Sequence, residues 1–313
     1  MNGRPTDQEL SEARQAIGLP TVQTVEKDWY VVQAMRAILA IDATPFRLVF
    51  AGGTCLARAH RLVGRMSEDV DFKVIPATAS MSNNQRRQAL GGLRDRLVAS
   101  LTAAGFTLAE PPRSRDANQY TVLHLRTSNA EGEGAPLRST IQIELSLAAL
   151  RTSTVTCPVI SFVNQAYGRP PELTQVECAS VTETAAEKAV SLTRRTAMEI
   201  AGVSRVPDPT LVRHIYDLHL VRDQVDADQV AALMREIAVM DAKQFAQQHP
   251  AYRDDIAAET HKALKHLASD PAVQARYTGF VGAMVYGKAA PFPEAIKTVA
   301  ALVHAAWPST ATH

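Results

Sequence analysis

The chain has 313 residues, of which 46% are hydrophobic and 21% are charged. This composition is that of a soluble globular protein with one large or two ordinary domains, and it excludes extensive disorder. Its 33 basic and 32 acidic residues leave a net charge of +1, so no global field attracts the protein to nucleic acid or to a membrane. Any polyanion must be bound by a local patch.

Targeting and cysteine usage favour the cytoplasm. The first residues are polar, and no stretch approaches the roughly 18 to 20 apolar residues that span a bilayer. The three cysteines are odd in number and lack the paired spacing of a zinc site or a disulfide framework. We interpret Cys55, Cys157 and Cys178 as small buried hydrophobic residues in a reducing compartment.

The N-terminal part predicts alternating strands and helices. A Gly52-Gly53 turn connects the first strand to a helix that Thr54 can cap, and the glycine-rich stretch SNAEGEGAPL joins the last two strands into a hairpin. Residues 151–180 look less regular. The expected elements are a helix over 25–40, a strand over 46–50, a helix over 55–63, a strand over 69–75, a helix over 84–104, and strands over 120–126 and 139–147.

From residue 181 onward the pattern is almost entirely helical. This change predicts a domain boundary near residue 180, with one domain over 1–180 and a second over 181–313. Thr184 and Glu187 have the spacing of a capping box in the first helix, and Asp208 can cap the second. Helices are expected over 181–198, after 207–209, and over 228–247, 256–268 and 293–306.

An acidic pair on the second strand is the strongest chemical signal. Asp69 and Asp71 are two residues apart, so both side chains leave the same face of the sheet. Glu144 lies among apolar residues on a later strand, and it can join the pair if the two strands are neighbours. Three such carboxylates would suit Mg²⁺ ions, which could clamp the oxygens of a nucleotidyl displacement.

The glycine turn supplies a complementary feature. Gly52 and Gly53 allow the backbone to approach a phosphate, and the N–H groups of the following helix would face that anion. Thr54 and Ser67 could add hydroxyl donors. Taken singly, each feature has an ordinary interpretation, namely a tight turn, a solvated acidic pair and an edge residue, and only the combination in this order favours chemistry.

The combined pattern resembles a nucleotidyltransferase of the DNA polymerase β superfamily, and more narrowly the AbiEii/AbiGii toxin family with its MenT-like members. The run GGT…RMSEDVDF is the most specific part. The matching segments are spread over about two thirds of the chain and are VEKDWYVVQAM (25–35), FAGGTCLARAHRLVGRMSEDVDF (50–72), IQIELS (141–146), TAAEKAVSLTRR (184–195) and RHIYDLHLV (213–221).

The resemblance implies an α+β fold, in which a polymerase β-like lobe with a mixed sheet precedes an all-helical lobe. It also implies the toxin of a toxin–antitoxin pair that uses a nucleoside triphosphate with Mg²⁺ or Mn²⁺ and has a cognate antitoxin. Ser67, Asp69, Lys188 and Asp217 fall at catalytic positions, and Asp71 completes the acidic pair. Related toxins transfer nucleotides to the 3′ end of tRNA, which is the acceptor expected by analogy.

Two departures from the family pattern stand out. Fourteen residues separate Thr54 from Asp69, which is longer than the shorter polymerase β signature and predicts an extra helical turn. His214 occupies a position that is often Asp. A zinc site formed by His214 and His219 is improbable, because residues five apart on a helix do not share a face.

The predicted helices carry further candidate residues. Lys188 and Arg195 are seven apart and share a helix face, which would present two cations to triphosphate oxygens. Asp217 could orient Lys188 or act as a base; without the resemblance, Arg213 and Asp217 would be read as a surface ion pair.

Other residues have a structural or a nucleic-acid interpretation. Lys27, Asp28 and Trp29 are interpreted as packing and ion-pairing residues of the first predicted helix. The candidate RNA contacts are Arg86, Arg87, Arg94, Arg96, Arg113 and Arg115.

Three functions remain open at this level. The leading hypothesis is a toxin that transfers a nucleoside monophosphate to RNA. The second keeps the enzyme class but moves the acceptor to a small molecule or a protein side chain. The third is a nucleotide-binding partner protein without turnover.

Overall fold

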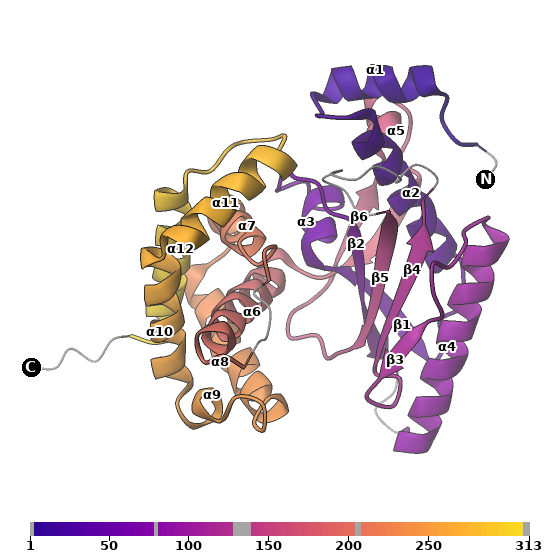
Figure 1. The fold of residues 1–313 in the computed structure, drawn as a ribbon. Coiled ribbons are helices and arrows are strands. Elements are labelled where there is room, and N and C mark those ends of the chain that lie inside the picture. Colours follow the sequence, from indigo (N-terminus) through magenta and orange to yellow (C-terminus); the bar gives the residue numbers. More distant parts are fainter. Residues whose placement is uncertain (1–2, 78–80, 128–138, 204–207, 309–313) are drawn as a thin grey trace, which may run out of the picture. The chain divides into compact units, whose positions relative to one another are not determined.

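The computed structural model describes residues 3–77, 81–127, 139–203 and 208–308, and its elements are labelled in Figure 1. The chain divides into two compact units, one of residues 1–61 and 65–179 and one of residues 62–64 and 180–313. A short segment of the N-terminal part, residues 62–64, therefore packs with the C-terminal unit. In the described parts of the chain, no helix is both long and apolar enough to cross a membrane.

The first unit is built on a seven-stranded sheet with the order β3-β4-β5-β2-β1-β7-β6. Strand β2 pairs antiparallel with β1 and parallel with β5, and β1 is parallel to β7, so the sheet is mixed as expected. Strands β4 and β5 pair antiparallel, whereas the predicted glycine-rich connection lies outside the described residues. The strands are β1 (Phe46–Ala51), β2 (Asp69–Pro76), β3 (Arg113–Arg115), β4 (Tyr120–Arg126), β5 (Thr140–Leu147), β6 (Val155–Val159) and β7 (Leu173–Cys178).

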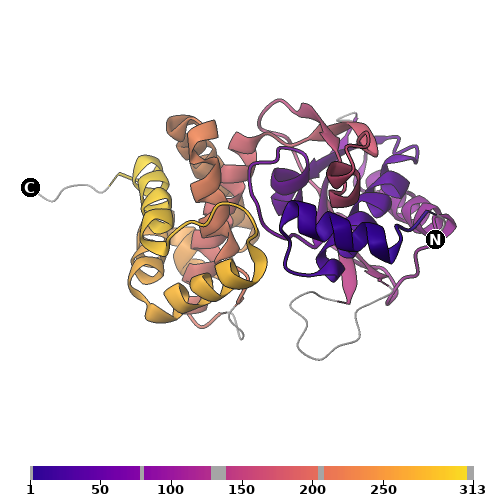
Figure 2. The ribbon, with the colours of Figure 1, turned by 90° about the horizontal axis from the view of Figure 1, so that it is seen from above.

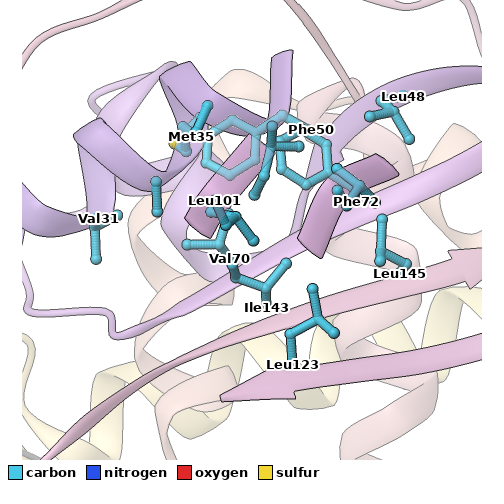
Figure 3. Close-up of a cluster of buried hydrophobic side chains, with 14 of the residues drawn as sticks. Val31, Met35, Leu48, Phe50, Val70, Phe72, Leu101, Leu123, Ile143 and Leu145 are labelled. Atoms are coloured by element: carbon cyan, nitrogen blue, oxygen red, sulfur yellow. The ribbon is translucent and has the colours of Figure 1, made fainter. Parts of the chain in front are cut away.

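Alternation along the strands separates an apolar face of the sheet from a polar one. On the apolar face, Val70 and Phe72 of β2 pack with Ile143 of β5 and with Val31 and Met35 of a helix (Figure 3). Asp69, Asp71 and Lys73 alternate with those β2 residues and therefore lie on the opposite face. The helices of this unit are α1 (Asp7–Ile17), α2 (Val22–Leu39), α3 (Gly52–Arg58), α4 (Asn83–Ala103) and α5 (Phe162–Ala166).

Three expectations for this unit are wrong. Residues 151–180 are not irregular but contain β6, α5 and β7, and the two short strands mix exposed, partly buried and buried side chains without regular alternation. The helix expected over 55–63 begins at Gly52 and ends at Arg58, and its N-cap is Ala51 rather than Thr54. The extra helical turn expected before Asp69 is absent, because residues 59–68 form a loop that contains one isolated bridge residue.

Helix α2 presents charged side chains to the interior of the unit, where each has an ionic partner. Lys27 pairs with Glu68, the residue between Ser67 and Asp69. Asp28 lies 2.8 Å from Nε of Arg58 on α3 and accepts a 2.6 Å hydrogen bond from the backbone N–H of Phe162 on α5. The interpretation of Lys27 and Asp28 as ion-pairing residues of α2 is confirmed.

Burial and charge oppose each other at Asp28. Burial raises the pKa of its carboxyl to about 6, although the Arg58 guanidinium favours the charged form. The guanidinium carbon of Arg58 also lies 3.5 Å from the centroid of the Phe162 ring. Three helices therefore meet at one buried ion pair, which fixes α3 behind the glycine turn.

The second unit is all helical, and α6, α7, α8, α10 and α12 pack together as a bundle (Figure 2). Within it the loop residue Gly64 approaches Gly287, and a Cβ built on Gly64 would lie 2.6 Å from the Cα of Gly287. The helices are α6 (Val181–Ile200), α7 (Arg213–Val221), α8 (Ala227–Gln244), α9 (Pro250–Asp254), α10 (Ile256–Ser269), α11 (Pro271–Met284) and α12 (Phe292–Ala306), with a 3₁₀ turn η1 (Arg222–Gln224).

Both predicted caps of this unit are wrong. Ser180 caps α6 by accepting from the N–H of Glu183, and the hydroxyl of Thr184 instead donates to the carbonyl of Ser180. Asp208 lies five residues before Arg213, the start of α7, and accepts from the N–H of Thr210 at 2.8 Å. In both cases a side-chain oxygen accepts from a backbone N–H. Ser180 does so at the start of α6, earlier in the chain than predicted, and Asp208 does so in the turn before α7.

The buried pair gives a stability prediction. Asp28→Ala would leave the Arg58 guanidinium desolvated without its partner, which costs about 3–5 kcal/mol of unfolding free energy. The matched control is Arg47→Ala, because Arg47 pairs with Glu177 but its side chain is 50% exposed, and we expect a loss below about 1 kcal/mol. Urea unfolding measures both, and equal losses in the two variants would contradict the assignment.

Candidate active site

The glycine turn comes directly after β1, where the chain leaves the sheet. Gly52 has a φ of +74°, a left-handed conformation that favours glycine. A Cβ at this position would lie 1.9 Å from Oδ2 of Asp71. Position 52 therefore favours glycine for two reasons. The backbone has a left-handed φ there, and the Asp71 carboxylate occupies the space of a side chain.

Two of the predicted acids lie side by side on neighbouring strands. In the parallel pairing of β2 with β5, Asp71 is opposite Glu144 and Asp69 is opposite Gln142. The condition set by the sequence analysis, that the strand carrying Glu144 is a neighbour of the strand carrying the acidic pair, is met. Directly opposite side chains on adjacent strands share a face, so Asp71 and Glu144 project from the polar face together.

Asp69 and Ser67 are tied to the turn through Thr54. The buried Thr54 hydroxyl lies 2.8 Å from Oγ of Ser67 and also donates to the backbone carbonyl of Asp69. Asp69 itself is 7% exposed. Thr54 thus connects α3 to the first residue of β2, and we expect this positioning to be its main role at the site.

Two basic residues at the site were not singled out from the sequence. Arg65 is 2% exposed, and a Cβ on Gly53 would lie 2.3 Å from its Nη2, so the absent side chain of Gly53 makes room for the guanidinium. Arg65 also donates through Nη1 to the carbonyl of Met66 at 3.0 Å. Lys73 is 6% exposed and shares the face of Asp71, which the alternation of DVDFK could have indicated.

Polar side chains continue across the sheet from Glu144. The Nε2 group of Gln142 donates to Glu144, and Nε2 of His124 lies 3.1 Å from Oε1 of Gln142. Burial, and then the negative charge of Glu144, raise the pKa of Tyr120. The polar face therefore carries a connected row of side chains that orients the Glu144 carboxylate.

The fit to a divalent cation is partial. Within residues 3–77, 81–127, 139–203 and 208–308, no group of three or more His, Cys, Asp or Glu side chains could hold a metal ion. The adjacent Asp71 and Glu144 nevertheless match the one or two carboxylates that Mg²⁺ uses when substrate phosphates complete its shell. The metal role of Asp69, Asp71 and Glu144 stays a prediction.

The helical unit carries the other predicted catalytic residues. Nζ of Lys188 on α6 lies 2.8 Å from Oδ2 of Asp217 on α7, and the Asp217 side chain is fully buried. A surface ion pair is therefore the wrong interpretation for Asp217. The contact favours the orienting role of Asp217 over the role of a base.

Arg195 and His214 differ in their surroundings. The Arg195 side chain is 38% exposed and pairs with Asp208. His214 is buried, and its Nδ1 has no hydrogen-bond partner among the residues that the structure describes. Burial, followed by the positive charge of Lys188, lowers the pKa of His214 well below its usual value, so the imidazole is neutral at pH 7.

Several of the six arginines predicted to contact RNA make intramolecular contacts. Arg96 donates to the carbonyls of Asp42 and Thr44, and Arg113 pairs with Glu110. Arg115 lies over the ring of Tyr120, 4.0 Å from the centroid. These contacts account for several of the six residues structurally, and an RNA role for the six stays a prediction.

The buried imidazole gives a pH prediction. The pKa of His214 is lower in the folded than in the unfolded chain, so below about pH 6.5 the unfolded chain binds a proton that the folded chain does not. Stability is therefore lost as the pH falls from 6.5. We expect His214→Asn to flatten this loss in unfolding measurements between pH 8 and 5. An unchanged slope in His214→Asn would show that the imidazole is not the source.

Comparisons with known proteins bear on the family and on the fold of the chain. The family model for the nucleotidyl transferase AbiEii toxin of type IV toxin–antitoxin systems matches residues 33–302. A comparison with curated protein sequences finds no significant match. Among solved structures, MenT4, a nucleotidyltransferase toxin from Mycobacterium tuberculosis H37Rv, is similar with a TM-score of 0.53 and 18% identity, covering 95% of this chain and 89% of MenT4.

The structural likeness confirms the α+β fold with its helical C-terminal part, and the match of the family model confirms the resemblance seen in the sequence. The match covers the glycine turn, the acidic pair, Glu144 and the Lys188–Asp217 pair. The chain therefore belongs to the AbiEii family of nucleotidyltransferase toxins of type IV toxin–antitoxin systems.

Proposed function

We propose that this nucleotidyltransferase moves a nucleoside monophosphate from a nucleoside triphosphate to RNA, with the 3′ end of tRNA as the acceptor, in a reaction that requires Mg²⁺ or Mn²⁺. It would act in the cytoplasm and be counteracted by a cognate antitoxin. The observation that carries the proposal is the pairing of Asp71 with Glu144, with the Asp71 carboxylate against Gly52. Two neighbouring carboxylates beside a turn without side chains suit a cation and a phosphate together.

The side chains of the sheet unit have distinct roles in this proposal. Asp71 and Glu144, with Asp69, would hold the cation, which supplies charge neutralisation for the triphosphate oxygens. The spaces beside Gly52 and Gly53 hold the Asp71 carboxylate and the Arg65 guanidinium, so these glycines would bind a phosphate only through their backbone N–H groups. Ser67 lies 3.5 Å from the position of a Cβ on Gly53. Thr54 keeps Ser67 and Asp69 in place through its hydroxyl.

The helical unit would supply positive charge. Lys188 is held by the buried carboxylate of Asp217, so its ammonium group is fixed in one direction rather than free to rotate in solvent. A fixed cation stabilises the charge that develops on phosphoryl oxygens without reorganisation. Arg195 would add a second, more exposed charge.

The activity test uses the purified chain with Mg²⁺, each common ribonucleoside triphosphate labelled at the α-phosphate, and total RNA. We expect label in tRNA, lost when the cation is chelated. Asp71→Asn should reduce labelling by at least about 100-fold, since removal of even an outer-shell partner of a metal costs 10- to 100-fold. Asp95→Asn is the matched control, because Asp95 is an exposed acid of the same unit.

Other outcomes of this assay select another function. Label on a small molecule or on a protein would move the acceptor. Triphosphate binding without labelling of any acceptor would contradict turnover by this chain and favour a nucleotide-binding partner protein. Full activity of Asp71→Asn would contradict the assignment of the acidic site.

A second prediction tests whether activity depends on the space that Gly52 leaves for the Asp71 carboxylate. Gly52→Ala places a methyl group 1.9 Å from Oδ2 of Asp71, so the carboxylate must move, and a displacement of about 1 Å can cost about 100-fold in rate. Gly168→Ala is the matched control, because Gly168 also has a positive φ but nothing lies within 4 Å of its Cβ position. Both variants carry about 1–2 kcal/mol of backbone strain. Equal activities of the two folded variants would contradict this account.

A further inference from the structure

The three cysteines of the chain converge in the fold although they are far apart in the sequence. Cys55 lies on α3, Cys157 on β6 and Cys178 on β7. All three are free thiols, and Cys157 packs against the hydrophobic cluster that contains Cys55 and Cys178. The expectation of buried thiols therefore holds for Cys55 and Cys178 but not for Cys157, which is partly exposed.

Strand pairing places Cys157 and Cys178 as diagonal neighbours. In the antiparallel pair of β6 and β7, Cys157 is opposite Val176 and Cys178 is opposite Val155. Val176 and Cys178 are two residues apart and share a face, and Cys157 lies on that same face. The Cys178 thiol donates to the carbonyl of Val176 at 3.3 Å, and Val176 is the residue directly opposite Cys157.

The surroundings give the thiols different reactivities. Hydrogen bonds from Cys55 and from Cys157 lower the pKa of Cys178, although burial opposes this effect. Burial raises the pKa of Cys55 and of Cys157. Cys178 therefore has the greatest thiolate character, and thiolates are the nucleophiles in disulfide chemistry.

We propose that Cys157 and Cys178 form a peroxide-sensitive thiol pair. Hydrogen peroxide reaches the partly exposed Cys157 and converts its thiol to a sulfenic acid with release of water. The Cys178 sulfur then attacks the Cys157 sulfur, a disulfide forms, and the sulfenic oxygen leaves as a second water. The two thiols are oxidised by two electrons and the peroxide is reduced by two.

The pair lies next to the strand that ends in the glycine turn. Cys178 is paired with Phe50 of β1, and the N–H of Ala179 donates to the carbonyl of Phe50 at 2.8 Å. Cys55 follows Gly52 and Gly53 on α3. A disulfide at Cys178 would therefore cross-link β6 to the strand that supports this turn. Thiols in reducing compartments that form disulfides usually do so transiently, as redox sensors.

The test treats the reduced full-length protein with hydrogen peroxide, alkylates it under denaturing conditions and measures its mass. We expect a loss of about 2 Da before alkylation and one alkylatable thiol, Cys55, instead of the original three. Cys55→Ser should still form the disulfide and retain no free thiol. Cys157→Ser, altered at the most exposed of the three positions, should keep both of its thiols.

Several results would overturn the proposal. Loss of both thiols in Cys157→Ser would assign the disulfide to Cys55 and Cys178. A gain of oxygen in the wild type without loss of two thiols would mean that no resolving step occurs, and three intact thiols would mean that peroxide does not reach the site. These readouts do not involve nucleotide transfer, so they stand or fall separately from the proposed function.

Discussion

The carboxylate of Asp71 occupies the space that a side chain on Gly52 would fill, and the geometry of the acidic site follows from this close approach. Antiparallel pairing places Ala51 opposite Asp71, so the chain must turn immediately beyond the acid. A residue with a Cβ would displace the carboxylate. Parallel pairing then brings Glu144 beside Asp71, which adds a second negative charge where β1 ends.

Buried ion pairs of α2 fix the loop and the helix that surround the acidic site. Lys27 pairs with Glu68 next to Asp69, and Asp28 pairs with Arg58 at the end of α3. Both pairs are largely withdrawn from water, so removing one partner costs far more than at the surface. The loop that carries Ser67 and the helix that carries Thr54 are thereby fixed to the same element.

Local patterns in the sequence predicted β1, β2, β4, β5 and most helices, because alternation and helical spacing report directly on which face is buried. The acidic pair on one face of β2 followed from the same rule. The pairing of β2 with β5 did not, since a register between residues about seventy positions apart depends on tertiary packing. The Arg65 guanidinium fills the space that a side chain on Gly53 would occupy. The spacing of residues in the sequence does not predict such a contact. Residues 151–180 were missed because β6 and β7 are short and carry little hydrophobic alternation.

His214, which stands where the family resemblance would often expect Asp, leaves the helical unit with a charge that suits its proposed role. Lys188, Arg213 and Arg195 act on His214 as positive charges, and Asp217 acts as a negative one. An ionised Asp at position 214 would neutralise one of the cations and would compete with Asp217 for Lys188. A neutral imidazole does neither, so the surroundings of Lys188 stay more positive. A triphosphate carries several negative charges. A neutral His214, compared with an ionised Asp, would therefore strengthen the electrostatic attraction between Lys188 and the triphosphate.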